Sequence, residues 1–178
     1  MKPEEKSNIF LIGYRCTGKT TVGRRLAMLT GRRFVDTDDR FKEQFGTIAG
    51  FVADHGWASF RDRESVILDT VSRGEDAVVA TGGGIVLRPA NVSLMKQRGL
   101  VVWLKASRET IWQRMTADPA TRDSRPGLTG YPLQEEIDRT LTERWPLYEK
   151  AMDIRIDTDG MTVDEICRHV TAAMAGKG

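Results

Sequence analysis

The chain has 178 residues, of which 40% are hydrophobic and 29% are charged, and its formal net charge is +2. This length suits one compact domain with its own core, and the composition is ordinary for a soluble globular protein. The near balance of 27 basic and 25 acidic residues, with no basic stripe, argues against a nucleic-acid partner. No apolar run reaches membrane-spanning length, and the polar N-terminus lacks the apolar centre of a signal peptide. The two cysteines do not resemble a disulfide framework, so we expect a cytoplasmic monomer or small oligomer, with the monomer the simpler expectation.

Short apolar runs alternate along the chain with longer segments of helical spacing. The runs that predict strands are 9–12, 34–35, 77–80, 101–104 and 154–156. The segments that predict helices are 19–30, 39–73 with interruptions near Gly46 and Gly56, a stretch from Pro89, 107–115, 133–152 and a last one after the capping-box pair Thr162 and Glu165. Because strands that alternate with helices pair in parallel through helical crossovers, the predicted fold class is α/β, a three-layer sandwich around a five-stranded parallel sheet. Residues 1–178 are predicted to form a single domain with a mobile loop at 116–131, which is polar and rich in Pro, Gly and Thr.

The stretch GYRCTGKT, residues 13–20, fits the pattern G-x-x-x-x-G-K-[ST] at every fixed position. A predicted strand precedes it and a predicted helix follows it, which is the context that a phosphate-binding loop requires. In such a loop, backbone N–H groups point at the phosphates and the helix N-terminus adds positive potential. Lys19 can bridge the outer phosphates and the Thr20 hydroxyl can bind Mg²⁺. The sequence therefore predicts a nucleotide phosphate site, which we call the phosphate loop.

Cys16 is unusual inside this loop. Its thiol could be reactive, because a nearby helix N-terminus stabilises a thiolate. The simpler interpretation is a small side chain that fills space.

Two carboxylates follow the second predicted strand, at Asp36 and Asp38. In an open parallel sheet, ligands bind beyond the carboxyl ends of the strands. Since alternate residues of a strand point to the same side, we expect Asp36 and Asp38 to face one cleft. One could hold Mg²⁺ through water while the other accepts hydrogen bonds from a substrate hydroxyl. Asp38 could also be a helix N-cap, which would not exclude contact with a ligand.

An arginine between aromatic residues follows in the stretch WASFRDRE, where Arg61 lies near Trp57 and Phe60. Arg61 and Glu64 are three residues apart on a predicted helix and can pair, either as an ordinary surface salt bridge or within a binding site. An arginine fork matches a carboxylate through two parallel hydrogen bonds. The flanking aromatic residues favour a binding site, in which Arg61 is a candidate contact for a carboxylate.

Three consecutive glycines, residues 82–84, end the third predicted strand, and a simple turn would rarely need all three. We expect their backbone to contact a ligand.

Two arginines, Arg122 and Arg125, lie in the 116–131 loop. An arginine on a closing loop can neutralise charge on a transferring phosphoryl group. The loop could equally be a solvated excursion. Arg144 lies in the long helix after that loop and could be a second arginine for an anionic substrate or a surface residue.

Six motifs in order give the chain a resemblance to the shikimate kinase family over about residues 7–174. They are GYRCTGKTTVG, RRFVDTD, WASFRDRE, VVATGGGIV, SRPGLTG and ERWPLYEKA. Each is weak alone except the phosphate loop, but together they are highly specific. The longer loop before Arg125 and the LTG that follows resemble the variety found as the second isozyme in enteric bacteria. The resemblance implies a P-loop kinase fold and the ATP-dependent phosphorylation of the 3-hydroxyl of shikimate, within aromatic amino-acid biosynthesis.

The resemblance also implies a role for each matching residue. Asp38 would bind the shikimate hydroxyls and accept the reacting proton, and Arg15 would lie close to the reacting groups. The substrate contacts implied are Asp38, Arg61, Gly83 and Arg144. The ATP contacts implied are Gly13, Cys16, Thr17, Gly18, Lys19, Thr20, Thr21 and the loop arginine Arg125. Thr20 and, through water, Asp36 would hold Mg²⁺, and Arg114 would lie near the adenine.

One departure from the family pattern is visible at Cys16, where the family usually has glycine. If that position has a positive φ, Cys16 would be strained. Three alternatives stay open at this point. They are a kinase for another small hydroxy acid such as gluconate, a nucleoside monophosphate kinase, for which the sequence shows no base pocket, and a non-catalytic module that only binds ATP.

Overall fold

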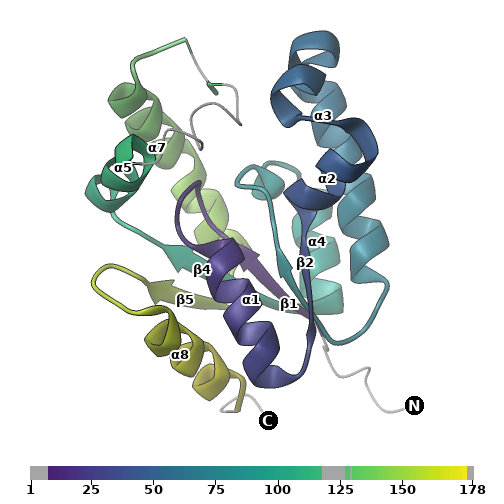
Figure 1. Ribbon diagram of the computed structural model, residues 1–178, viewed down its shortest axis with the longest axis vertical. Coiled ribbons are helices and arrows are strands. Elements are labelled where there is room, and N and C mark those ends of the chain that lie inside the picture. The colour runs from purple at the N-terminus through teal and green to yellow at the C-terminus, as the bar shows by residue number, and fades with distance from the viewer. Residues whose placement is uncertain (1–7, 118–126, 129, 176–178) are drawn as a thin grey trace.

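A five-stranded parallel sheet forms the centre of the computed structural model, which describes residues 8–117, 127–128 and 130–175 (Figure 1). Its strands are β1 (Asn8–Ile12), β2 (Arg33–Asp36), β3 (Ala77–Ala80), β4 (Gly99–Lys105) and β5 (Ile154–Asp157). Their order across the sheet is β2-β3-β1-β4-β5, and every neighbouring pair is parallel. This confirms the predicted α/β class and the five strands.

Helices cover both faces of the sheet, which makes three layers. The helices are α1 (Lys19–Thr30), α2 (Thr37–Phe45), α3 (Ile48–Ser72), α4 (Pro89–Arg98), α5 (Arg108–Ala117), α7 (Leu133–Ala151) and α8 (Val163–Ala175), with a 3-10 turn at Ile85–Leu87. Ile9 and Leu11 of β1 pack with α1 and α8, whereas Phe10 and Ile12 pack with α3, α4 and α7 (Figure 1). The apolar run of β1 is therefore buried on both faces, as expected for a central parallel strand.

Local signals account for most helix ends. Gly31 ends α1 in the left-handed conformation, with φ 66°, and its N–H bonds the carbonyl of Ala27. The Ser107 hydroxyl accepts a hydrogen bond of 3.1 Å from the N–H of Thr110 at the start of α5. At the start of α8, the Glu165 carboxylate accepts from the N–H of Thr162 at 2.7 Å, completing the predicted capping box.

The predicted breaks at the two glycines between residues 39 and 73 are also confirmed. Gly46 follows the end of α2 with φ 79°, and Gly56 has non-helical angles of φ 79° and ψ 168° inside α3. The break at Gly56 redirects α3 just before Trp57 and Arg61. It therefore helps to set how the second half of α3 approaches the sheet.

The 116–131 loop lies mostly outside the described residues. Helix α5 continues to Ala117 and α7 begins at Leu133. Arg122, Arg125 and Pro126 lie outside the residues that the structure describes. The expectations for these residues and for the movement of this loop therefore stay predictions. Across the described ranges, no helix is both long enough and apolar enough to cross a bilayer.

The strand order places three loops at one edge of the sheet. β1 lies between β3 and β4 and leads into the phosphate loop, while β2 and β3 lead into α2 and the glycine triplet. Because all strands are parallel, their carboxyl ends share this edge. The sheet therefore brings together motifs that lie as far apart in sequence as Asp36 and Gly84.

Candidate active site

The phosphate loop connects β1 to α1 and folds around its own lysine. Lys19 is only 8% exposed, and its Nζ donates to the carbonyl oxygens of Gly13, at 2.8 Å, and Tyr14, at 2.7 Å. Gly18 lies at the N-cap of α1 with φ 91°, a conformation that favours glycine. A Cβ at Gly13 would lie 2.5 Å from the carbonyl oxygen of Leu104, so no larger residue fits there. The loop thus presents a buried cation and a helix N-terminus together, as an anion site requires.

Cys16 has a positive φ of 58°, which is the conformation that the family's glycine would adopt without cost. For a residue with a Cβ, this conformation costs roughly 1–2 kcal/mol. The Cys16 side chain is half-buried against an apolar cluster that includes Tyr14, and its carbonyl accepts a 2.9 Å hydrogen bond from Arg114. The packing and the hydrogen bond offset part of the strain, which supports the space-filling interpretation.

Thr20 and Asp36 form a pair of oxygen donors beside the phosphate loop. The Thr20 hydroxyl donates to Asp36 Oδ2 at 2.7 Å. Magnesium prefers oxygen ligands and usually keeps several waters, with only one or two protein ligands. The described residues contain no cluster of three or more His, Cys, Asp or Glu that could hold a metal by itself. The Thr20–Asp36 pair therefore fits Mg²⁺ that is also bound by nucleotide phosphates.

The two aspartates at the junction of β2 and α2 have different immediate partners. Helix α2 already begins at Thr37, so alternation ends at Asp36. The N-cap of α2 is Asp36, whose Oδ1 accepts from the N–H groups of Asp38 and Asp39, so the alternative assignment of Asp38 as N-cap is wrong. Asp38 is 7% exposed and lines a pocket, while Asp36 bonds Thr20.

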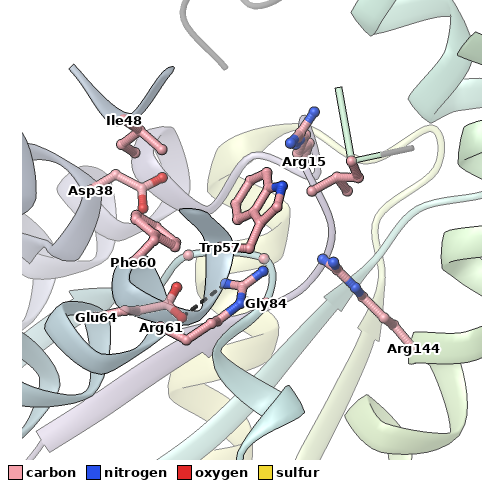
Figure 2. Close-up of a pocket in the computed structure, with 12 residues that line it drawn as sticks. Arg15, Asp38, Ile48, Trp57, Phe60, Arg61, Glu64, Gly84 and Arg144 are labelled. Atoms are coloured by element: carbon pink, nitrogen blue, oxygen red, sulfur yellow. Dashed lines mark hydrogen bonds and ion pairs between the residues drawn. The ribbon is translucent and has the colours of Figure 1, made fainter. Parts of the chain in front are cut away.

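This pocket lies next to the phosphate loop (Figure 2). Polar and charged side chains gather in it from helices that are distant in the sequence, together with the glycine triplet and a few apolar groups. Its lining consists of Arg15, Asp38, Ile48, Trp57, Phe60, Arg61, Glu64, Gly82, Gly83, Gly84, Leu128 and Arg144. Asp38, Arg61, Gly83 and Arg144, which the sequence singled out for the substrate, are thus brought together.

Arg61 is fixed in the pocket wall by its neighbours. Its Nη1 donates to Glu64 Oε2 at 2.9 Å, and its guanidinium lies 5.3 Å from the ring centroids of both Trp57 and Phe60. The Arg61 side chain is 14% exposed and that of Glu64 is 3% exposed, so the alternative of a surface salt bridge is wrong. Burial raises the pKa of Glu64, and the nearby Asp38 charge adds to the rise, while the charges of Arg61 and Arg144 oppose it.

Two glycines of the triplet, Gly82 and Gly84, lie directly against these charged groups, whereas a Cβ at Gly83 would make only ordinary contacts. A Cβ at Gly84 would collide with the Arg61 guanidinium, and one at Gly82 would collide with the Glu64 carboxylate. The carbonyl of Gly83 accepts a short hydrogen bond from the Tyr148 hydroxyl. The triplet therefore lets backbone line a crowded polar pocket.

Two further arginines reach the pocket from other elements. Arg144 of α7 is 6% exposed, which excludes the surface alternative, and it points into the pocket from the side opposite Asp38 (Figure 2). Arg15 of the phosphate loop is 7% exposed and lies 3.8 Å from a carboxylate oxygen of Glu136. Three cationic groups and two carboxylates therefore surround one small cavity, an arrangement suited to an anionic ligand that also carries hydroxyls.

A second cavity adjoins the other side of the phosphate loop. Its lining combines loop residues with apolar groups from α8 and the segment before it, and it consists of Cys16, Thr17, Gly18, Thr21, Val22, Arg114, Ala117, Thr158, Met161, Val163 and Ile166. An apolar surface beside a phosphate site suits a nucleotide base. Arg114, which the sequence resemblance places near the adenine, is one of the residues that line this cavity.

Sequence reasoning missed two buried residues at the pocket. Tyr148, which is fully buried, bonds Gly83, and Glu136, which is 4% exposed, pairs with Arg15. Tyr148 lies four residues after Arg144 on α7, so helical spacing could have placed both on one face. Glu136 looked like an ordinary acidic residue in the first turn of a helix, and no local signal separates it from Glu135.

Comparison with known proteins agrees with the geometry. The family model described as "SKI: Shikimate kinase" matches residues 15–175. The chain is 48% identical over 145 residues to Shikimate kinase 2 of Sodalis glossinidius, covering 81% of this chain and 82% of that one. It is 41% identical over 174 residues to Shikimate kinase of Syntrophus aciditrophicus, covering 90% and 89%. The solved structure of shikimate kinase from Acinetobacter baumannii in complex with shikimate is 34% identical, with a TM-score of 0.89 over 98% of this chain and 96% of that one. This chain therefore belongs to the shikimate kinase family.

Proposed function

We propose that this protein transfers the terminal phosphoryl group of ATP to the 3-hydroxyl of shikimate, giving ADP and shikimate 3-phosphate on the route to aromatic amino acids. The observation that carries the proposal is the buried pocket beside the phosphate loop, where Arg61 and Arg144 face the cavity together with Asp38. Shikimate has one carboxylate and three hydroxyls, so it needs both cationic and acceptor groups. Its family and a relative solved with shikimate bound support the same substrate.

The phosphate loop binds the nucleotide in this proposal. Backbone N–H groups from Gly13 to Thr21 and the Lys19 ammonium contact the phosphates, and the base occupies the cavity near Arg114. Thr20 and Asp36 hold Mg²⁺, which neutralises charge on the phosphates when bound. Arg125 is proposed from the sequence to meet the phosphates as well, although it lies outside the described residues.

The pocket binds two kinds of group on shikimate, the carboxylate and the hydroxyls. Arg61 and Arg144 bind the carboxylate, and their burial makes each charge-assisted hydrogen bond stronger than it would be in water. Asp38 accepts hydrogen bonds from the shikimate hydroxyls and orients the 3-hydroxyl. The backbone of Gly83 makes a further contact with the ring substituents.

The chemistry then depends on alignment and charge. Phosphoryl transfer passes through a loose transition state with charge on its peripheral oxygens, so an enzyme contributes mainly position and positive potential. Lys19 and Arg15 supply positive charge on the side of the pocket where the loop lies, and Asp38 takes the proton from the attacking hydroxyl. The burial of these groups limits access of water, which would otherwise be phosphorylated in place of the substrate.

We propose a monomer as the simplest working form, since one chain carries both the phosphate loop and the proposed substrate contacts. Both Cys16 and Cys167 are free thiols, which is consistent with a reducing cytoplasm. The proposed working form is therefore a cytoplasmic monomer with a small-molecule substrate and no nucleic-acid or membrane partner.

A coupled assay for ADP release tests the proposal. Shikimate, quinate and gluconate would each be offered with ATP and Mg²⁺. We expect rapid ADP release with shikimate and release near background with the other two. Turnover of gluconate without turnover of shikimate would indicate a kinase for another hydroxy acid, and ATP binding without any transfer would indicate a non-catalytic module. Either outcome would overturn the proposal.

A further inference from the structure

A buried carboxylate behind the pocket contacts two parts of its wall. Glu136 lies in the first turn of α7 and is 4% exposed. Its Oε1 lies 3.8 Å from Nη1 of Arg15, and its Oε2 accepts a 2.9 Å hydrogen bond from the backbone N–H of Leu128. Both Arg15 and Leu128 line the pocket proposed for shikimate, whereas Glu136 is not one of its lining residues. One carboxylate therefore connects two pocket residues that are 113 positions apart.

The neighbouring glutamate shows how a surface acid behaves on the same helix turn. Glu135 pairs with Arg139 one turn later at 2.8 Å, and their side chains are 44% and 56% exposed. Such an exposed pair contributes little to stability, typically below about 1 kcal/mol. Glu136 instead points away from the helix toward the phosphate loop. Its ion pair with Arg15 is buried, because the side chain of Arg15 is 8% exposed and that of Glu136 is 5% exposed.

A buried carboxylate is expensive to desolvate, so it needs compensating charges and hydrogen bonds. Glu136 receives both from Arg15 and Leu128, which are residues of the pocket wall. The carboxylate contributes to the direction of the Arg15 guanidinium, because the ion pair favours the arginine rotamers that keep the two groups close. It also anchors the backbone at Leu128.

We infer that Glu136 is a positioning residue for phosphoryl transfer, which aligns Arg15 and the Leu128 wall without touching the substrate. The inference rests on the proposed function, because Arg15 matters only if a phosphoryl group is transferred beside it. Loss of the carboxylate would misplace the arginine and loosen the wall at the same time. Nucleotide binding would change little, since the phosphates are bound by the phosphate loop backbone and by Lys19, which is held by the carbonyl groups of Gly13 and Tyr14.

The test compares two adjacent substitutions of identical chemistry, Glu136→Gln and Glu135→Gln. In Glu136→Gln the side-chain oxygen can still accept from Leu128, while the negative charge facing Arg15 is lost. We expect kcat/KM for shikimate to fall at least tenfold in Glu136→Gln and to stay within twofold of wild type in Glu135→Gln. The dissociation constant for ATP, measured by calorimetry without shikimate, should stay within threefold in both variants.

A double-mutant cycle separates positioning from a general loss of structure. If the charge acts through Arg15, adding Glu136→Gln to Arg15→Gln should lower kcat by less than threefold beyond the single Arg15→Gln variant. A purely structural role would lower activity by the same factor in both backgrounds and would overturn the inference. So would a Glu136→Gln enzyme whose kcat/KM matches that of Glu135→Gln.

A second substitution keeps the test decisive if Glu136→Gln does not fold. Glu136→Asp retains the charge but is one methylene shorter, so it cannot reach both Arg15 and Leu128 from the same backbone position. We expect it to fold and to lose at least threefold in kcat/KM for shikimate, and wild-type kinetics in this variant would overturn the inference. Failure of the wild-type protein to phosphorylate shikimate would instead refute the proposed function, so the two failures are distinguishable.

Discussion

Arg61 and Glu64 form a 2.9 Å ion pair inside the wall of the pocket, with the guanidinium 5.3 Å from the ring centroids of both Trp57 and Phe60. Pairs three residues apart on a helix are usually solvated and weak. Here the side chain of Arg61 is only 14% exposed and that of Glu64 only 3% exposed. Arg61 also lines the cavity. The pair therefore holds a positive charge ready for an anionic ligand, which reduces the ordering cost of binding.

Replacement of Arg61 by alanine should weaken shikimate binding by about 2–5 kcal/mol, because truncating one partner of a buried charged contact leaves the other charge unpaired. The loss should appear in the dissociation constant for shikimate measured by calorimetry. Arg63→Ala is the matched control, since Arg63 is exposed two residues away on the same helix. An Arg61→Ala variant with unchanged shikimate affinity would rule out the carboxylate contact.

The buried Glu64 predicts a pH dependence of stability. Its pKa in the folded protein is raised above the ordinary value of 4.5, mainly by burial, with Asp38 of α2 adding to the rise and Arg61 of α3 and Arg144 of α7 opposing it. The folded state therefore binds the proton more tightly, so the contribution of Glu64 to stability is present at low pH and is lost as the pH rises above 4.5.

Urea unfolding of the wild type and Glu64→Gln at several pH values measures this contribution. Glutamine resembles the protonated carboxyl and does not titrate. The free energy of unfolding of the wild type relative to Glu64→Gln should decrease between pH 4.5 and pH 7.5. A difference that is constant, or that increases with pH, would show that the pKa of Glu64 is not raised.

Lys19→Ala should lower kcat by roughly 10²–10³-fold, the usual effect of removing one group that stabilises transition-state charge. The same variant should remain folded by circular dichroism, because the two carbonyl groups that Lys19 bonds belong to its own loop. Lys42→Ala, at an exposed lysine 44% accessible on α2, should leave kcat unchanged. Near-normal turnover in Lys19→Ala would contradict its phosphate role.

Cys16 provides a prediction about strain in the phosphate loop. Its φ of 58° suits glycine and is unfavourable for β-branched residues. Cys16→Ala should retain kcat and the KM for ATP within threefold if the thiol only fills space. Cys16→Val should lower the free energy of unfolding by about 1–3 kcal/mol, because a branched side chain is forced into a left-handed conformation. A tenfold loss of kcat in Cys16→Ala would instead indicate that the thiol takes part in the reaction.

Local signals made much of this fold predictable from the sequence. The phosphate loop follows a fixed pattern, α1 ends at a glycine with positive φ, and α8 begins with its capping box. Buried parallel strands have continuous apolar runs, so β1 and β3 were recognisable from their composition alone. Each of these features depends on residues close together in the chain.

The remaining features depend on contacts between distant residues. Helix α2 begins at Thr37, only two residues before the predicted start at residue 39. The N-cap of α2 is therefore Asp36 and not Asp38. The burial of Arg144 and the pairing of Glu136 with Arg15 arise only when α7 is packed beside the phosphate loop. Sequence spacing could suggest a second arginine for the substrate, but it could not choose between the surface and the pocket.

The position of the phosphate on the product is the most direct test of the proposed reaction. Shikimate would be incubated with ATP, Mg²⁺ and the protein, and the products would be identified by ³¹P and proton magnetic resonance. The arrangement of Asp38, Arg61 and Arg144 around one pocket predicts equal amounts of ADP and shikimate 3-phosphate. Inorganic phosphate without phosphorylated shikimate, or a phosphate on another hydroxyl, would contradict the proposed orientation of the substrate.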